Sequence, residues 1–173
     1  MTKATFRYII LYLVMVLAQV VVFNNLVLFN CAVPLVFIYL VICLPASLST
    51  NKSMTVAFLT GLLVDAFSDS YGMNALACTV LAFVRKPVFH LYVSRDEDPT
   101  VQPLTMHSLG VPQFMKYALT MTLIYMVVYF IAEAFNFFNF ERMLLRIVAS
   151  TVYTFLMVCA VSSLSVSHRE KKL

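Results

Sequence analysis

Long apolar runs separated by short polar stretches dominate this chain. The runs cover residues 6–23, 33–48, 54–67, 73–93, 114–135 and 143–166. A helix needs about 20 mostly apolar residues to cross the hydrocarbon core of a bilayer. The pattern therefore predicts an all-α, polytopic membrane protein with about six transmembrane helices.

Prolines and polar residues mark the limits of these runs. Pro34 stands in the first turn of the run 33–48, where a missing amide is tolerated, and Pro45 is expected to kink or end that helix. The run 73–93 either ends at Arg85-Lys86-Pro87 or continues past the proline to Val93. Residues 94–112 are polar and rich in proline, which predicts a loop. The remaining length leaves no room for a separate soluble domain, so residues 1–173 are predicted to form a single integral membrane domain.

Composition agrees with this pattern. Hydrophobic residues make up 62% of the 173 residues and charged residues 12%, and the mean hydropathy is +0.90. A soluble domain is typically about 45–50% apolar and about 25% charged, so the sequence excludes a soluble globular protein and a disordered one. The four cysteines show neither C-x-x-C pairing nor metal-ligand spacing, which argues against a disulfide framework.

The placement of basic residues predicts the orientation in the membrane. Assigning alternate connections to opposite sides puts 10 of the 12 basic residues on one side. They are Lys3, Arg7, Lys52, Arg85, Lys86, Arg95, Lys116, Arg169, Lys171 and Lys172. Basic residues mark the cytoplasmic side, so both termini and the loop 94–112 are predicted to be cytoplasmic. The net charge of +4 follows the ends of apolar runs rather than forming a patch, which argues against nucleic acid as a partner.

Asp65 is the main candidate for a functional polar group, because ionisable side chains within membrane spans are costly unless they have partners. Gly61 lies four residues earlier, on the same helix face, where glycine allows close helix approach. One interpretation is a packing seam whose buried carboxylate holds the following turn or binds a partner. The other is a carboxylate solvated at the level of the headgroups, and the sequence leaves both open.

A second group of charges surrounds the last outer turn: Glu133, Glu141, Arg142 and Arg146. The two arginines are spaced i,i+4 on one helix face. Arg146 is expected about one turn inside the membrane, where it either pairs with Glu133 or Asp65 or extends outward. We favour pairing, because an unpaired arginine at depth costs a few kcal/mol.

Patterns typical of catalysis are missing from the sequence. It contains no H-E-x-x-H, G-x-S-x-G or P-loop motif, and its three histidines lack metal-ligand spacing. We therefore expect no enzymatic activity, no metal and no cofactor. A transporter remains open, although we find no convincing half-to-half repeat of the kind that transporters often contain.

One stretch resembles a known family. Residues 61–76 read GLLVDAFSDSYGMNAL, which looks like the signature of the rod shape-determining protein MreD family: a glycine, apolar residues, an aspartate, a polar turn, then glycine and a small-apolar helix start. The proline-led run at Pro34 is similar to the second helix of that family. Carried over by motif, Gly61, Asp65, Gly72 and Asn74 are the candidate functional positions. The stretch 96–103 is longer than the usual family connection.

The resemblance implies a non-enzymatic scaffold of the bacterial cell-wall elongation machinery in the inner membrane. It implies an MreC-like protein as the direct partner, and MreB, RodA and a penicillin-binding transpeptidase as indirect ones. The family is also similar in fold to the substrate-binding subunits of energy-coupling-factor vitamin transporters. That similarity supplies the alternative hypothesis, a six-helix subunit that captures a small solute.

Overall fold

The computed structural model describes residues 15–17, 19, 34–45, 47–68, 70–93, 104–133 and 140–170. The regular elements within these ranges are all helices: α2 (Ile38–Ile42), α3 (Thr50–Ser68), α4 (Met73–Tyr92), α5 (Met106–Leu109), α6 (Val111–Glu133) and α7 (Phe140–Glu170). This confirms the all-α class. The predicted span 6–23 lies mostly outside the described residues.

Three of the described helical stretches are long and apolar enough to cross a membrane: Met73–Tyr92, Val111–Glu133 and Met143–Ser163. They correspond to the apolar runs 73–93, 114–135 and 143–166. Helix α3 is 19 residues long and includes the run 54–67. It does not join these three, because its first turn consists of Thr50, Asn51, Lys52 and Ser53, which lower its mean hydropathy.

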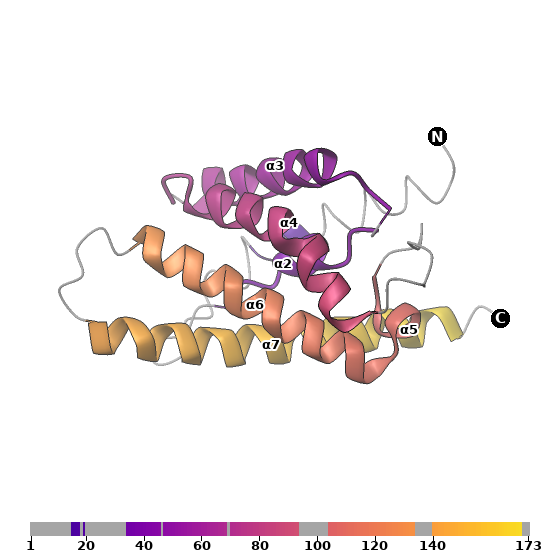
Figure 1. The fold of residues 1–173 in the computed structure, drawn as a ribbon. Coiled ribbons are helices and arrows are strands. Elements are labelled where there is room, and N and C mark those ends of the chain that lie inside the picture. The colour runs from indigo at the N-terminus through magenta and orange to yellow at the C-terminus, as the bar shows by residue number, and fades with distance from the viewer. Residues whose placement is uncertain are drawn as a thin grey trace.

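The long helices pack in chain order. Helix α3 lies along α4, α4 packs against α6, and α6 packs against α7 (Figure 1). Figure 1 also shows that the end of α3, the start of α4, the end of α6 and the start of α7 lie at the same end of the molecule. The short helix α2 is enclosed by this group and contacts both α4 and α6.

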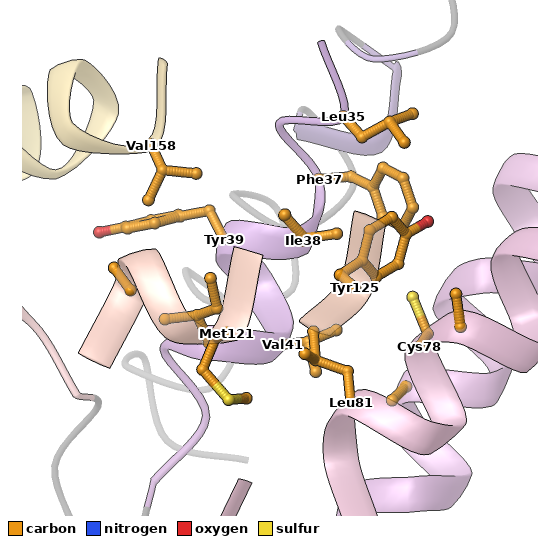
Figure 2. Close-up of a cluster of buried hydrophobic side chains, with 14 of the residues drawn as sticks. Leu35, Phe37, Ile38, Tyr39, Val41, Cys78, Leu81, Met121, Tyr125 and Val158 are labelled. Atoms are coloured by element: carbon orange, nitrogen blue, oxygen red, sulfur yellow. The ribbon is translucent and has the colours of Figure 1, made fainter. Parts of the chain in front are cut away.

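The core is built around α2. Phe37, Ile38, Val41 and Ile42 are each 0% exposed. In Figure 2, Tyr39 lies on the side of Val158, whereas the rings of Phe37 and Tyr125 lie together. The Phe37 and Tyr125 rings meet edge to face, with centroids 6.0 Å apart. Side chains therefore leave this segment in several directions, and its burial on all sides explains why the sequence shows an unbroken apolar run here.

The run 33–48 does not form the single spanning helix that the sequence predicts. Its helix is Ile38–Ile42, 5 residues long, or about 8 Å at the usual rise. Pro34 lacks an amide proton, and beyond Ile42 the backbone leaves the helix at Cys43 before reaching Pro45. The interruption is stable because side chains from distant parts of the chain bind its free backbone groups, as described below.

Of two other limits, one agrees with a predicted alternative and the other differs from the prediction. Helix α4 continues through Pro87 to Tyr92, which agrees with the predicted limit of residue 93 to within one residue. The polar segment 94–112 is not a loop throughout: it contains α5 and the start of α6. Leu104, at the start of its described part, is 0% exposed, so apolar burial gives this end of the segment a fixed structure. Gly110 joins α5 to α6 at φ +82°, a value that favours glycine.

Candidate functional site

The carboxylate of Asp65 is the centre of a hydrogen-bond network at the turn between α3 and α4. The residue is 5% exposed. Its Oδ1 accepts hydrogen bonds from the Ser70 hydroxyl at 2.6 Å, and from the backbone amide and side-chain amide of Asn74 at 3.1 and 2.9 Å. Its Oδ2 accepts one from the Ala75 amide at 2.8 Å. Of the two interpretations of Asp65, the structure thus supports the buried carboxylate that holds the turn. We call Asp65, Ser70, Asn74 and Ala75 the Asp65 network.

This network caps helix α4. The first amides of a helix have no partner within it and usually receive one from the residue preceding the helix. Here that residue is Gly72, which has no side chain and adopts φ 80°. Asp65 reaches across from α3 and accepts from the second and third residues of α4 in its place. Its negative charge also interacts favourably with the N-terminal end of the α4 dipole.

Glycine is required at Gly61 for this arrangement. A Cβ atom there would lie 2.5 Å from both Ala75 Cα and the Asn74 carbonyl oxygen. Those are backbone atoms, which cannot rotate away. Gly61 therefore allows α3 to approach the first turn of α4, and so sets the distance at which Asp65 reaches its partners.

Asn74 connects the network to α6. Its Nδ2 donates to Asp65 and, at 3.0 Å, to Ser70, while its Oδ1 accepts from the Tyr125 hydroxyl at 2.6 Å. Tyr125 also stacks on Tyr129, with centroids 6.2 Å apart. The four motif positions Gly61, Asp65, Gly72 and Asn74 thus lie in one small region that joins α3, α4 and α6.

The hydrogen bonding indicates what Asp65 does chemically. A carboxylate offers about four acceptor positions, and Asp65 receives four hydrogen bonds. Both of its oxygens are therefore engaged within the protein. Among the described residues, no group of three or more His, Cys, Asp or Glu side chains is arranged to hold a metal ion.

The charges at the end of α6 and the start of α7 form a separate pair at the same end of the molecule. Arg146 of α7 donates to Glu133 of α6 at 3.2 Å, and its guanidinium carbon lies 5.0 Å from the centre of the Phe130 ring. The preferred pairing of Arg146 is therefore confirmed, with Glu133 rather than Asp65 as partner. Glu141 and Arg142 lie in the first turn of α7, and the side chain of Arg142 is outside the described part.

Arg85 lies in the protein interior, a position that the sequence did not indicate. It was assigned to the cytoplasmic end with the basic residues that indicate orientation, but it is 1% exposed. Its guanidinium binds the Leu44 carbonyl, the Pro45 carbonyl at 3.1 Å and the Ser53 hydroxyl at 3.0 Å. Without Arg85, nine basic residues lie on the predicted cytoplasmic side and two on the other side, so the predicted orientation is unchanged.

A helical pattern in the sequence could have located Arg85. The buried face of α4 includes Asn74, Cys78, Leu81, Arg85 and Phe89. These positions recur every three or four residues, as one face of a helix requires. Once α4 is extended through Pro87, Arg85 falls on its inner face rather than at its end.

The other side of α2 has its own polar partner. Gln19 is 0% exposed, and its Oε1 accepts from the amides of Val36 and Phe37 at 2.8 and 3.3 Å. Its Nε2 donates to the Pro34 carbonyl at 2.9 Å. The Leu35 amide donates to the Thr154 hydroxyl of α7 at 3.2 Å. Buried side chains thus satisfy the backbone on both sides of α2.

Comparison with known proteins adds no relative: no family model, no curated protein and no solved structure matches this chain.

Proposed function

We propose that this chain is a non-enzymatic scaffold subunit of the bacterial cell-wall elongation machinery, similar to the rod shape-determining protein MreD. In this proposal the chain crosses the inner membrane six times, once through the interrupted run 33–48, and has both termini in the cytoplasm. The observation that carries it is the segment Gly61–Leu76, which resembles the family signature. Each of its four motif residues has a defined place at the junction of α3, α4 and α6.

The exposed surface of the helices supports a scaffold. Leu59, Leu62, Leu63 and Phe67 of α3 are 45–62% exposed, and Leu145 of α7 is 70% exposed. In a bilayer such faces contact lipid tails or apolar helices of other proteins. Because both oxygens of Asp65 accept hydrogen bonds within the chain, we assign that residue to holding these faces in place rather than to chemistry.

Partner capture and cell shape test the proposal together. A tagged chain, solubilised from its own host, should co-purify an MreC-like protein, and its depletion should turn rods into spheres. An unrelated polytopic protein with the same tag is the control for capture. Unchanged rods together with no captured MreC-like protein would refute the scaffold.

A matched pair of variants sharpens the cell-shape experiment. Gly61→Leu places a large side chain against the α4 backbone and should fail to restore rod shape after depletion. Phe83→Ala changes an α4 side chain that is 60% exposed and lies outside the faces named above, and it should restore rod shape. Restoration by both variants would remove the helix junction from the proposal.

One observation favours the alternative, a solute-binding subunit similar to those of vitamin transporters. Interrupted helices with buried charges are typical of transporter binding sites, and α2 is interrupted beside the buried Arg85. Native mass spectrometry of the purified chain distinguishes the two functions. A stoichiometric small molecule supports the transporter subunit, whereas a chain that carries none supports the scaffold.

A further inference from the structure

The break after α2 leaves backbone carbonyls that need donors. A helix ends with carbonyl groups that its own amides do not reach. In a membrane interior no water is present to bind them, so irregular backbone is tolerated only where protein groups satisfy it. Ile42 and Cys43 receive such donors from the Tyr117 hydroxyl at 3.5 Å and the Leu104 amide at 3.2 Å.

The next two carbonyls depend on Arg85. Its Nη1 donates to the Leu44 carbonyl, and its Nη2 donates to the Pro45 carbonyl at 3.1 Å and to the Ser53 hydroxyl at 3.0 Å. One planar guanidinium on α4 thereby binds the stretch after α2 and the first turn of α3. A guanidinium suits this position because its donors are held in a rigid fork. We call Arg85 with these three partners the Arg85 clamp.

The charge of Arg85 is held by neutral acceptors. Among the residues that the structure describes, Arg85 has no carboxylate within ion-pairing distance, and its buried Nε has no hydrogen-bond partner. A buried charge is costly unless hydrogen bonds compensate it. The three bonds of the clamp therefore hold both the charge and the interrupted backbone, and the loss of either side leaves the other without partners.

We infer that the Arg85 clamp stabilises a closed local conformation, in which the described residues between α2 and α3 are held against α4. The inference does not depend on the proposed function. The Cys43 amide still donates to the Tyr39 carbonyl at 2.9 Å, but beyond it the backbone bonds within this stretch are long: Leu44 to Val41 at 3.4 Å and Leu48 to Pro45 at 3.3 Å. Its closure therefore depends on bonds to a residue 40 or 41 positions away in the chain. Segments with few bonds of their own open first.

Two native cysteines report opening at different places. Cys43 is half-buried and immediately precedes the clamped carbonyls, whereas Cys78 is buried on α4 beside the packing with α6. A thiol reacts through its thiolate, which does not form in an apolar, closed environment. Opening of the clamp should therefore raise the reactivity of Cys43 and leave that of Cys78 unchanged.

The experiment uses the full chain in lipid vesicles and N-ethylmaleimide as the probe. One background retains Cys43 alone and the other Cys78 alone, with the remaining cysteines replaced by alanine. In each background, Arg85→Gln is compared with Lys86→Gln, which removes the same charge one residue further along α4. Arg85→Lys, which retains the charge but not the fork, is the third variant.

Arg85→Gln should speed the modification of Cys43 about tenfold or more, because charge-assisted hydrogen bonds are lost. Arg85→Lys should give a smaller increase, and Lys86→Gln none. The modification of Cys78 should stay slow in all three variants. An unchanged rate at Cys43 in folded Arg85→Gln would overturn the inference, and so would an equal increase at Cys43 and Cys78, which indicates loss of the whole fold.

A milder variant covers the case in which Arg85→Gln does not fold. Ser53→Ala removes one acceptor of the clamp, while Leu44 and Pro45 remain in place. It should raise the rate at Cys43 by about two- to fivefold, in line with the loss of one such hydrogen bond. No change at Cys43 in this variant would also count against the clamp.

Discussion

At the scale of single residues, Asp65 shows how one carboxylate can organise a helix junction. It replaces the capping side chain that Gly72 lacks, and it does so from a neighbouring helix. Gly72 in turn supplies the left-handed backbone of the turn, at φ 80°. A polar side chain at position 72 could cap the helix but would be strained at that φ. One residue cannot easily do both, so Gly72 adopts the backbone angle of the turn and Asp65 supplies the cap.

Replacing Asp65 by asparagine should destabilise the protein markedly. Asparagine keeps one of the two oxygens, but its NH2 group would face either the amides of Asn74 or the amide of Ala75, which are themselves donors. We expect the free energy of unfolding to fall by about 1–3 kcal/mol. Thermal unfolding in detergent measures the change. Glu133→Gln, at a partly exposed pair, is the control and should cost at most about 1 kcal/mol. Equal effects of the two variants would contradict the central role of Asp65.

Replacing Gly61 by alanine tests the close approach of α3 and α4, because the sign of the change in the free energy of unfolding depends on it. In a helix with open space, this change stabilises by about 1 kcal/mol, because alanine is the better helix former. At Gly61 the new Cβ would lie 2.5 Å from the α4 backbone, and overpacking of this kind typically costs about 1–3 kcal/mol. We therefore expect a lower unfolding temperature. A higher one would show that the two helices are not in contact here.

At the scale of elements, the pairing of α6 with α7 ends in a charge pair of modest strength. Glu133 and Arg146 are 33% and 38% exposed, so water screens their attraction, and the contact of Arg146 with Phe130 adds to it. A double-mutant cycle with Glu133→Gln and Arg146→Gln measures the coupling directly. We expect it to be at most about 1 kcal/mol. A coupling of several kcal/mol would mean that the pair is far less solvated than its exposure indicates.

At the scale of the whole molecule, the ends of the long helices bring two connections to the same end. The turn between α3 and α4 and the facing ends of α6 and α7 lie at one end (Figure 1). That is the arrangement required if the connections after α3 and after α6 share a side of the membrane. The proposed six-span topology assigns both connections to the outside.

Reporter fusions test this topology. A reporter after Ser70 or after Asn139 should indicate the outside, and one after Thr100 the cytoplasm, because basic residues gather on the cytoplasmic side. Alkaline phosphatase and a fluorescent protein, active on opposite sides, provide complementary readouts. The reverse pattern would invert the orientation, and equal signals at Ser70 and Thr100 would show that α4 does not cross the membrane.

The sequence by itself determined the features that depend on neighbours along the chain. The predicted start of α4 matches the observed one, and its end lies one residue from the longer of the two limits that the sequence left open, because the apolar run and the glycine before it act locally. The motif Gly61–Leu76 was identified for the same reason: its turn, glycines and aspartate lie within 16 residues. Asp65 could be singled out, since a carboxylate at the edge of an apolar run needs partners.

Tertiary structure decided the features whose causes lie far apart in the chain. The run 33–48 is as apolar as a spanning helix, yet only α2 is helical, because Gln19, Arg85 and Thr154 bind the backbone on either side of it. The sequence also did not reveal the buried position of Arg85, because its partners lie 32–41 residues earlier in the chain. Local patterns show where apolar surface must be buried. They do not show which distant side chain will supply the hydrogen bonds that a buried break requires, and in this protein those bonds decide the path of the chain through its core.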